Sequence, residues 1–169
     1  MAMIIPYITN EEEAFEAVSY DGMDLKKVVL SLRTPELCLE AVKRKGIALT
    51  HVPEEHRTAE LCLKAVKQNG LALQYVPENL KTERLCLAAM KKDSRALQYA
   101  PKSIKTDEFC LGAVKQDGMA LKHVPAKLKT AEICMEAVKS RMEYQFNKAL
   151  ESVPKKLRDE VRARLKNVE

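Results

Sequence analysis

Residues 58–81 read TAELCLKAVKQNGLALQYVPENLK, and close copies of this stretch recur along the chain. The copies align on a cysteine that returns every 24 residues, at Cys38, Cys62, Cys86, Cys110 and Cys134. On this alignment the repeats begin near residues 10, 34, 58, 82, 106 and 130. A fixed period of this length is typical of small structural units that stack in tandem.

The first part of each repeat predicts an α-helix. In residues 58–70, Thr58 can cap the helix, Glu60 lies in its first turn, Lys67 lies near its end and Gly70 follows as a stop signal. The apolar positions of this helix span an arc of about 200°, and they are Leu61, Cys62, Leu63, Ala65 and Val66. We therefore expect the helix to be covered on two sides.

The second part of each repeat predicts a shorter helix. Pro77 lacks a backbone donor and disfavours helix in the residue before it, so residues 71–81 have room for one or two turns of α- or 3₁₀-helix. We expect Leu73, Val76 and Leu80 to pack inward. The predicted fold is all-α: an α-solenoid of about six 24-residue repeats, forming a single domain over residues 1–169.

The two ends depart from the repeat pattern as capping units do. In the first repeat, Ala14 stands in the cysteine position. The last repeat carries five extra residues within 141–148, so we expect its helix to continue past the usual stop. A C-terminal capping helix is predicted over 155–169, with Leu157, Val161, Leu165 and Val168 on one stripe.

Composition predicts a globular chain. Of its 169 residues, 46% are hydrophobic and 31% are charged, which suits one continuous core. The first residues contain no basic leader, and no apolar stretch approaches the roughly 20 residues that cross a bilayer. We therefore expect a soluble chain with no membrane partner, although secretion without a cleaved signal stays open.

The cysteines are expected to be buried, reduced thiols. Equivalent atoms of stacked helices lie about 8–10 Å apart, whereas a disulfide needs Cα atoms within about 7 Å. No C-x-x-C motif occurs, so a zinc site lacks its ligand cluster. Buried free cysteines are typical of a reducing compartment, and we expect the protein to be cytoplasmic.

The repeats resemble a known family. The segments 65–75, AVKQNGLALQY, and 113–121, AVKQDGMAL, are similar to a family of short tandem helical repeats that is catalogued only as a domain of unknown function. The resemblance covers roughly residues 34–140 and rests on A-V-K-x-x-G-x-A-L repeated in register. It implies a helical repeat architecture and supplies no reaction, cofactor or catalytic residue.

Two neighbouring positions vary between repeats and form a candidate recognition surface. The first holds Lys26, Thr50, Gln74, Gln98 and Lys122, and the second holds Lys27, His51, Tyr75, Tyr99 and His123. Rigid aromatic and hydrogen-bonding side chains suit protein recognition. The predicted protein-binding residues are His51, Gln74, Tyr75, Gln98, Tyr99, Lys122 and His123. The alternative is that Tyr75 and Tyr99 pack against adjacent repeats, and the sequence does not decide between the two.

Regular cations raise a second hypothesis. Residues 86–169 contain 18 basic and 11 acidic residues, whereas residues 1–85 contain 11 and 13. Candidate phosphate-binding residues are Lys67, Lys91, Lys115 and Lys139, and a further basic row follows Arg57, Lys81, Lys105, Lys129 and Arg158. Lysines at helix ends also stabilise the helix dipole, which explains the first row without a ligand.

Catalytic motifs are missing from the sequence. It has three histidines and no H-E-x-x-H, G-x-S-x-G or phosphate-binding loop. His51 and His56 flank a proline-containing segment, but His56 stands where most repeats have Leu or Ile, so we interpret it as structural. We expect no catalytic residue, metal, cofactor or small-molecule substrate. The function hypothesis is a non-catalytic protein-binding module, such as an adaptor, inhibitor or effector-like scaffold. The alternative is a nucleic-acid-binding solenoid that uses the basic C-terminal half.

Overall fold

The computed structural model describes residues 7–139 and 150–166. Residue contacts group the chain into two compact units, unit 1 over residues 1–93 and unit 2 over residues 94–169. The regular structure in the described residues is helical, and one isolated bridge joins Ile8 to Val28. This confirms the predicted all-α class, while the single folding domain stays a prediction.

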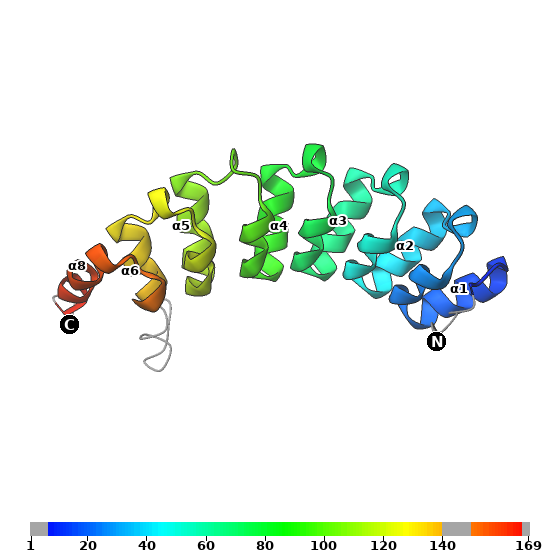
Figure 1. Cartoon of the computed structure of the whole chain (residues 1–169), viewed down its shortest axis with the longest axis horizontal. Helices are drawn as coiled ribbons and strands as arrows, with labels where there is room; N and C mark the ends of the chain where they lie inside the picture. The colour runs from blue at the N-terminus through cyan, green and yellow to red at the C-terminus, as the bar shows by residue number, and fades with distance from the viewer. Residues whose placement is uncertain (1–6, 140–149, 167–169) are drawn as a thin grey trace, which may run out of the picture. The chain divides into compact units, whose positions relative to one another are not determined.

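The described part of unit 1 contains four α-helices, and each of the first three is followed by two 3₁₀-helices (Figure 1). The α-helices are α1 (Glu11–Tyr20), α2 (Pro35–Arg44), α3 (Ala59–Gln68) and α4 (Glu83–Lys92). The 3₁₀-helices of this unit are η1 (Gly22–Lys27), η2 (Leu30–Leu32), η3 (Gly46–His51), η4 (Glu54–His56), η5 (Gly70–Tyr75) and η6 (Glu78–Leu80).

Unit 2 continues the same alternation. Its described elements are η7 (Ser94–Tyr99), α5 (Asp107–Gln116), η8 (Gly118–His123), η9 (Ala126–Leu128), α6 (Ala131–Lys139) and α8 (Lys155–Lys166). In the described part of the chain, no helix combines the length and the apolar composition needed to cross a bilayer.

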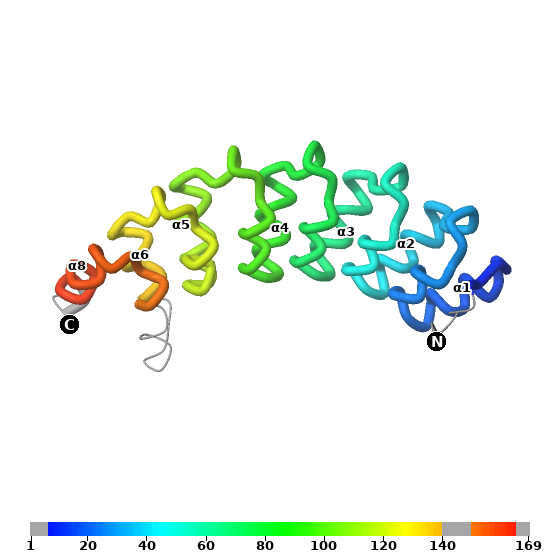
Figure 2. Tube along the Cα trace, in the orientation of Figure 1, coloured from blue at the N-terminus to red at the C-terminus, as the bar shows by residue number. Residues whose placement is uncertain are grey.

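Each unit stacks its repeats in two layers. In unit 1, α1 to α4 pack in chain order, and η1, η3 and η5 pack beside one another as the second layer. In unit 2, α5 packs against α6, α6 against α8, and η7 against η8. The chain trace follows the same course in successive repeats (Figure 2). These repeats form the predicted α-solenoid.

The predicted threonine caps are present. In five repeats the threonine hydroxyl accepts a hydrogen bond from the backbone N–H three residues later, at 3.2–3.3 Å. These threonines are Thr34, Thr58, Thr82, Thr106 and Thr130. In the first repeat, Asn10 takes this role and accepts from the N–H groups of Glu12 and Glu13. Each cap satisfies a donor that the helix start leaves free.

The glycine after each helix has a different role from the one predicted. No described residue has a positive φ, so no glycine forms a left-handed helix stop. The chain instead leaves α3 through the extended residue Asn69, whose N–H donates to the carbonyl of Ala65. Gly22, Gly46 and Gly70 lie so close to the next α-helix that an added Cβ would overlap its backbone. Glycine is therefore required here by close packing of neighbouring repeats.

Ser94 replaces this glycine at the start of unit 2. It is 7% exposed, and its hydroxyl donates a hydrogen bond to the Asp117 carboxylate in the next repeat. The helix it begins, η7, packs less extensively on α5 than η3 does on α3. The side chain of Ser94 is thus accommodated in two ways: it forms a hydrogen bond, and η7 packs more loosely on α5.

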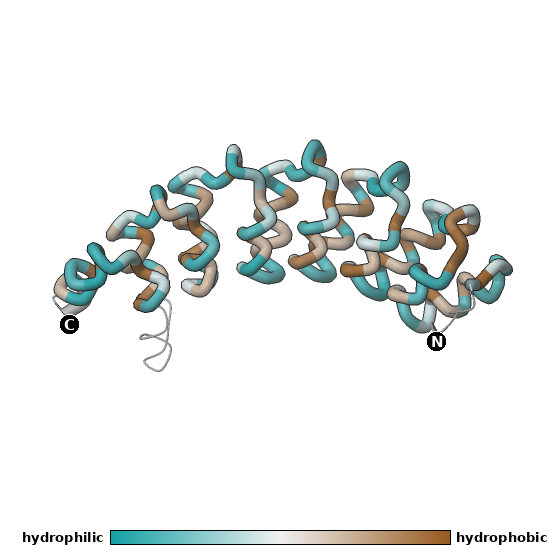
Figure 3. The backbone as a smooth tube through the Cα atoms, in the orientation of Figure 1, coloured by the Kyte–Doolittle hydropathy of each residue, from teal (hydrophilic) through white to brown (hydrophobic). Residues whose placement is uncertain are grey.

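The core repeats one set of side chains. In α3 it consists of Leu61, Cys62, Ala65 and Val66, and in η5 of Ala72 and Leu73, with Val76 following. Figure 3 shows the resulting alternation of hydrophobic and hydrophilic stretches along the trace. All five cysteines are free and fully buried, as predicted. Leu80 is only half-buried, and so is Leu63, which the broad apolar arc had led us to expect in the core.

The ends agree with the capping prediction where they are described. Ala14 is buried in α1, and α8 covers most of the predicted C-terminal helix, with Val161 fully buried. The predicted continuation of the last repeat's helix falls on residues 140–149, outside the described residues. The side chains of Leu165 and Val168 also lie outside them.

Candidate functional site

The aromatic ladder, defined as His51, Tyr75, Tyr99 and His123, lies at the ends of the 3₁₀-helices. All four side chains are half-buried. His51 and Tyr75 end the adjacent helices η3 and η5 of unit 1, and Tyr99 and His123 end the adjacent helices η7 and η8 of unit 2. The structure therefore brings the predicted residues together in pairs within each unit, and each pair combines packing with partial exposure.

The polar neighbours of the ladder differ in accessibility. The side-chain amide of Gln74 donates to the carbonyl of Leu71 in the same 3₁₀-helix, at 3.1 Å. Gln98 and Lys122 are exposed. Gln74 is therefore partly engaged by its own helix, whereas Gln98 and Lys122 present their side chains to solvent.

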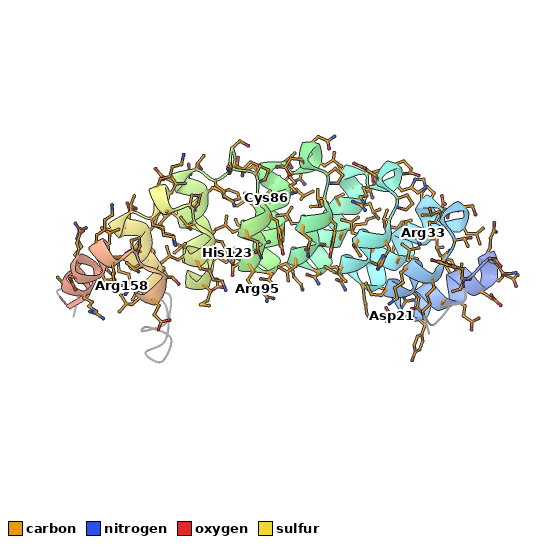
Figure 4. All side chains as sticks on the ribbon, viewed as in Figure 1. Asp21, Arg33, Cys86, Arg95, His123 and Arg158 are labelled. Atoms are coloured by element: carbon orange, nitrogen blue, oxygen red, sulfur yellow. The ribbon has the colours of Figure 1, made fainter. Side chains whose placement is uncertain are left out.

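The second basic row and Arg33, which stands at the equivalent position one repeat before Arg57, donate hydrogen bonds around this ladder. Arg33 donates from Nε to the carbonyl of Val28 and from Nη1 to that of His51, at 3.0 and 2.8 Å (Figure 4). Arg57 repeats the arrangement one repeat later, with Val52 and Tyr75, both at 3.0 Å. Each guanidinium thus joins one repeat to the next through carbonyls at helix ends, which otherwise lack donors.

In unit 2, basic side chains at the equivalent positions also donate to backbone carbonyls, and of these Lys129 reaches into the next repeat. Arg158 donates from Nε to the carbonyl of Val153 and from Nη2 to that of Glu151, both at 3.0 Å (Figure 4). Lys105 and Lys129 donate to the carbonyls of Gln98 and Ser152. This row is therefore engaged with the backbone, which argues against its use as a phosphate-binding stripe.

The two ladder histidines favour the neutral imidazole. Burial lowers the pKa of His51, and the nearby Arg33 and Lys26 lower it further. Burial also lowers the pKa of His123, and four surrounding cations, beginning with Lys122, act in the same direction. The Nε2 atom of His123 is buried, and no described residue forms a hydrogen bond with it. Desolvation and positive neighbours both disfavour the imidazolium.

The predicted phosphate-binding lysines are exposed on the last turns of their helices. Lys67 and Lys91 belong to unit 1, and Lys115 and Lys139 to unit 2. Lys139 lies 3.5 Å from the Glu136 carboxylate. Lys67 and Lys91, by contrast, form no ion pair with any residue that the structure describes.

An apolar row on the α-helical layer was missed by the sequence analysis. It occupies the position after the cysteine and consists of Phe15, Leu39, Leu63, Leu87, Leu111 and Met135. Phe15 is 54% and Leu87 is 38% exposed, and the other four are half-buried. A signal was available, because Leu63 follows Glu60 by three residues and precedes Lys67 by four, which places it on the charged stripe of the helix.

Hollows separate adjacent α-helices along this row in unit 1. The α3–α4 groove has a volume of about 690 Å³ and is lined by Leu63, Lys67, Thr82, Glu83, Arg84, Leu87, Ala88 and Lys91. A smaller hollow of about 320 Å³ lies between α2 and α3, where Leu39, His56 and Leu61 meet Glu55, Glu60 and Lys64. Both hollows are open to solvent and are lined by apolar as well as polar or charged side chains.

Nucleophilic chemistry is disfavoured at the cysteines. Burial raises the pKa of the Cys38 and Cys62 thiols to about 11, and burial also raises the pKa of the Cys110 and Cys134 thiols. These cysteines therefore remain protonated at neutral pH, and a thiol is a poor nucleophile. Over residues 7–139 and 150–166, no three His, Cys, Asp or Glu side chains converge as metal ligands would.

Comparison with known proteins identifies a repeat family. The family model described as "Domain of unknown function (DUF4116)" matches residues 10–57, 59–105 and 106–158. The first matched segment spans two complete 24-residue repeats. No curated protein and no solved structure matches the chain.

Proposed function

We propose that this chain, which belongs to the DUF4116 family of tandem repeats, is a non-catalytic module that binds a protein partner. It would act as an adaptor, an inhibitor or an effector-like scaffold. The observation that carries the proposal is the apolar row, whose leucines stay partly exposed. Three of them, Leu39, Leu63 and Leu87, line open hollows between the α-helices of unit 1. A surface that combines apolar side chains with polar edges is typical of protein-binding sites.

The aromatic ladder supports the same proposal through one further contact pair in each unit. Arg57 donates to the backbone carbonyl of Tyr75 and Lys105 to that of Gln98, and the side chains of Tyr75 and Tyr99 are half-buried. Rigid tyrosines lose little conformational entropy on binding. With Gln74 and His51 in unit 1, and Gln98, Lys122 and His123 in unit 2, they form the proposed protein-binding residues.

A protein without catalysis fits the chemistry of the candidate groups. The ladder histidines favour the neutral state but lie beside cations, with no described carboxylate to orient them as a general base. All five thiols are buried, and burial raises the pKa of four of them, Cys38, Cys62, Cys110 and Cys134. We further propose a cytoplasmic location, where free buried thiols are stable.

Nucleic-acid binding is the second candidate, favoured by the exposed Lys67 and Lys91 beside Arg84. Cations at repeat spacing could contact successive phosphates. Two observations argue against this candidate. Arginines at the position of the second basic row donate to backbone carbonyls. The α3–α4 groove is lined by leucines, whereas sites for single-stranded nucleic acid usually contain aromatic side chains that stack on the bases.

Affinity capture from cell lysate, with and without nuclease, tests the proposal. The bait is the full chain, compared with a Leu63→Ser/Leu87→Ser variant and with a Leu30→Ser control that alters an exposed leucine outside the apolar row. We expect a protein that is captured after nuclease treatment by the parent and the control but not by the double variant. Capture that disappears entirely with nuclease would favour the second candidate.

A further inference from the structure

The α3–α4 groove combines an apolar floor with a basic rim. Leu63 and Lys67 lie one turn apart on α3, and Leu87 and Lys91 lie one turn apart on α4. The two helices present these residues from equivalent repeat positions. Each helix therefore contributes one leucine and one lysine to the lining of the groove.

Arg84 gives this groove a distinct charge. It stands in the first turn of α4, where the other five repeats have glutamate, at Glu12, Glu36, Glu60, Glu108 and Glu132. The helix dipole favours an acid and disfavours a cation at this end. Dipole compensation can explain Lys67 and Lys91, but it cannot explain Arg84.

The three cations of the groove form no ion pair in the described chain, although Glu83 lines the groove and Glu60 lines an overlapping hollow with Arg84. Neither Lys67, Arg84 nor Lys91 forms an ion pair with a described residue, and Glu83 is the one acidic residue among the lining residues. The neighbouring hollow differs, because there Glu60 lies 2.9 Å from Lys64 and Glu55 adds a second carboxylate. On α2, the lysine that corresponds to Lys67 lies 3.6 Å from Glu40.

We infer that the α3–α4 groove binds a short, acidic, amphipathic segment of a partner protein. An apolar side chain of this segment would cover Leu63 and Leu87, and its carboxylates would lie against Arg84, Lys67 and Lys91. An unfavourable charge that the fold does not need is characteristic of a functional position. The inference rests on the proposed protein-binding function and gives its partner a chemical class.

Synthetic peptides about as long as α4 provide the test. The probe is a fluorescein-labelled peptide of leucine, alanine and glutamate with its leucines on one helical face. Its counterparts carry lysine for glutamate or serine for leucine, and an oligothymidylate serves as the nucleic-acid competitor. Fluorescence anisotropy gives the dissociation constant with the full chain, and NMR amide shifts locate the bound peptide.

The decisive variant is Arg84→Glu, which restores the residue of the other repeats. We expect this variant to preserve or raise the thermal unfolding temperature. It should weaken binding of the acidic peptide about tenfold, because an attractive charge becomes repulsive. Leu87→Ser should also weaken binding of the acidic peptide. Lys43→Glu, the matched charge change on α2 outside the groove, should leave the affinity for this peptide unchanged.

Several outcomes would overturn the inference. The lysine peptide could bind as tightly as the glutamate peptide, or the Arg84→Glu variant could bind the acidic peptide as tightly as the parent chain. The amide shifts could lie away from α3 and α4, or oligothymidylate could displace the peptide. If the acidic peptide fails to bind while lysate capture still depends on Leu63 and Leu87, the inference fails and the proposed function stands. If capture also ceases to depend on those leucines, both fail.

Discussion

Gly46 lies against the main-chain carbonyl of Ala65 in the next repeat, so closely that a Cβ at position 46 would overlap that oxygen. The relation recurs between Gly22 and Ala41 and between Gly70 and Ala89. Because the obstacle is backbone, a rotamer change cannot relieve it. The spacing between layers in unit 1 therefore depends on the absence of a side chain at these positions.

Gly46→Ala should destabilise the protein by about 1–3 kcal/mol, the usual cost of overpacking a core. The free energy of unfolding in urea measures this effect. Gly112→Ala is the matched control, because Gly112 lies inside α5 and an added Cβ would meet nothing within 4 Å. That control should stabilise the protein by about 0.5–1 kcal/mol through helix propensity. Equal effects of the two substitutions would contradict the packing argument.

Arg57→Met should cost about 1.5–3 kcal/mol, because it removes the charged donor that bonds to the carbonyls of Val52 and Tyr75. Chemical denaturation measures the loss. Lys67→Met, at an exposed lysine without a described ion pair, should change stability by less than about 0.5 kcal/mol. If the two variants unfold alike, the guanidinium does not join the repeats as described.

His123 should make stability fall in mild acid. Burial lowers the pKa of His123 in the folded chain, whereas the unfolded histidine titrates near its ordinary value of 6.5. The stabilisation is therefore fully present above about pH 6.5 and is lost as pH falls through the lowered pKa. His123→Gln should reduce the loss of unfolding free energy between about pH 7.5 and about pH 5. A control, His56→Gln, accounts for removing an imidazole elsewhere; an unchanged pH profile in His123→Gln would refute the assignment.

Tyr75→Ala/Tyr99→Ala should weaken binding of a captured protein by about 1 kcal/mol or more for each tyrosine that acts as a hot spot. Calorimetric titration measures the affinity, and circular dichroism checks that the variant stays folded. Tyr20→Ala is the control, since Tyr20 is 93% exposed on α1 and lies outside the ladder. A folded double variant that binds as tightly as the parent would remove the ladder from the proposed site.

The repeat architecture could be predicted from the sequence because its signals are local. Thr58 followed by an acid, an apolar stripe and a lysine defines a helix without reference to any neighbour, and Pro77 limits the helix that follows. The role of Gly46 could not be predicted in this way. This role depends on the close approach of Ala65 from another repeat. A glycine that ends a helix would stand at the same position in the sequence, so the sequence cannot distinguish the two roles.

The candidate site was harder to predict for a similar reason. Leu63 was assigned to the core because apolar side chains usually pack, and the distance between α3 and α4 that leaves it half-exposed is a property of the stack. Arg84 is different, since its departure from glutamate is visible when the repeats are aligned. Its place beside Leu87 in the lining of the α3–α4 groove is visible only in the structure.

The arginine contacts also have a consequence for the gain or loss of whole repeats. Arg33 reaches the carbonyl of His51, and Arg57 reaches that of Tyr75, across the same separation of 18 residues. If the 24 residues 34–57 were excised, Arg33 would meet Tyr75 in the geometry that Arg57 now has. The contacts between repeats of unit 1 are thus interchangeable. In-frame duplication or loss of one repeat would change the length of the proposed binding surface without requiring a new contact between repeats to evolve.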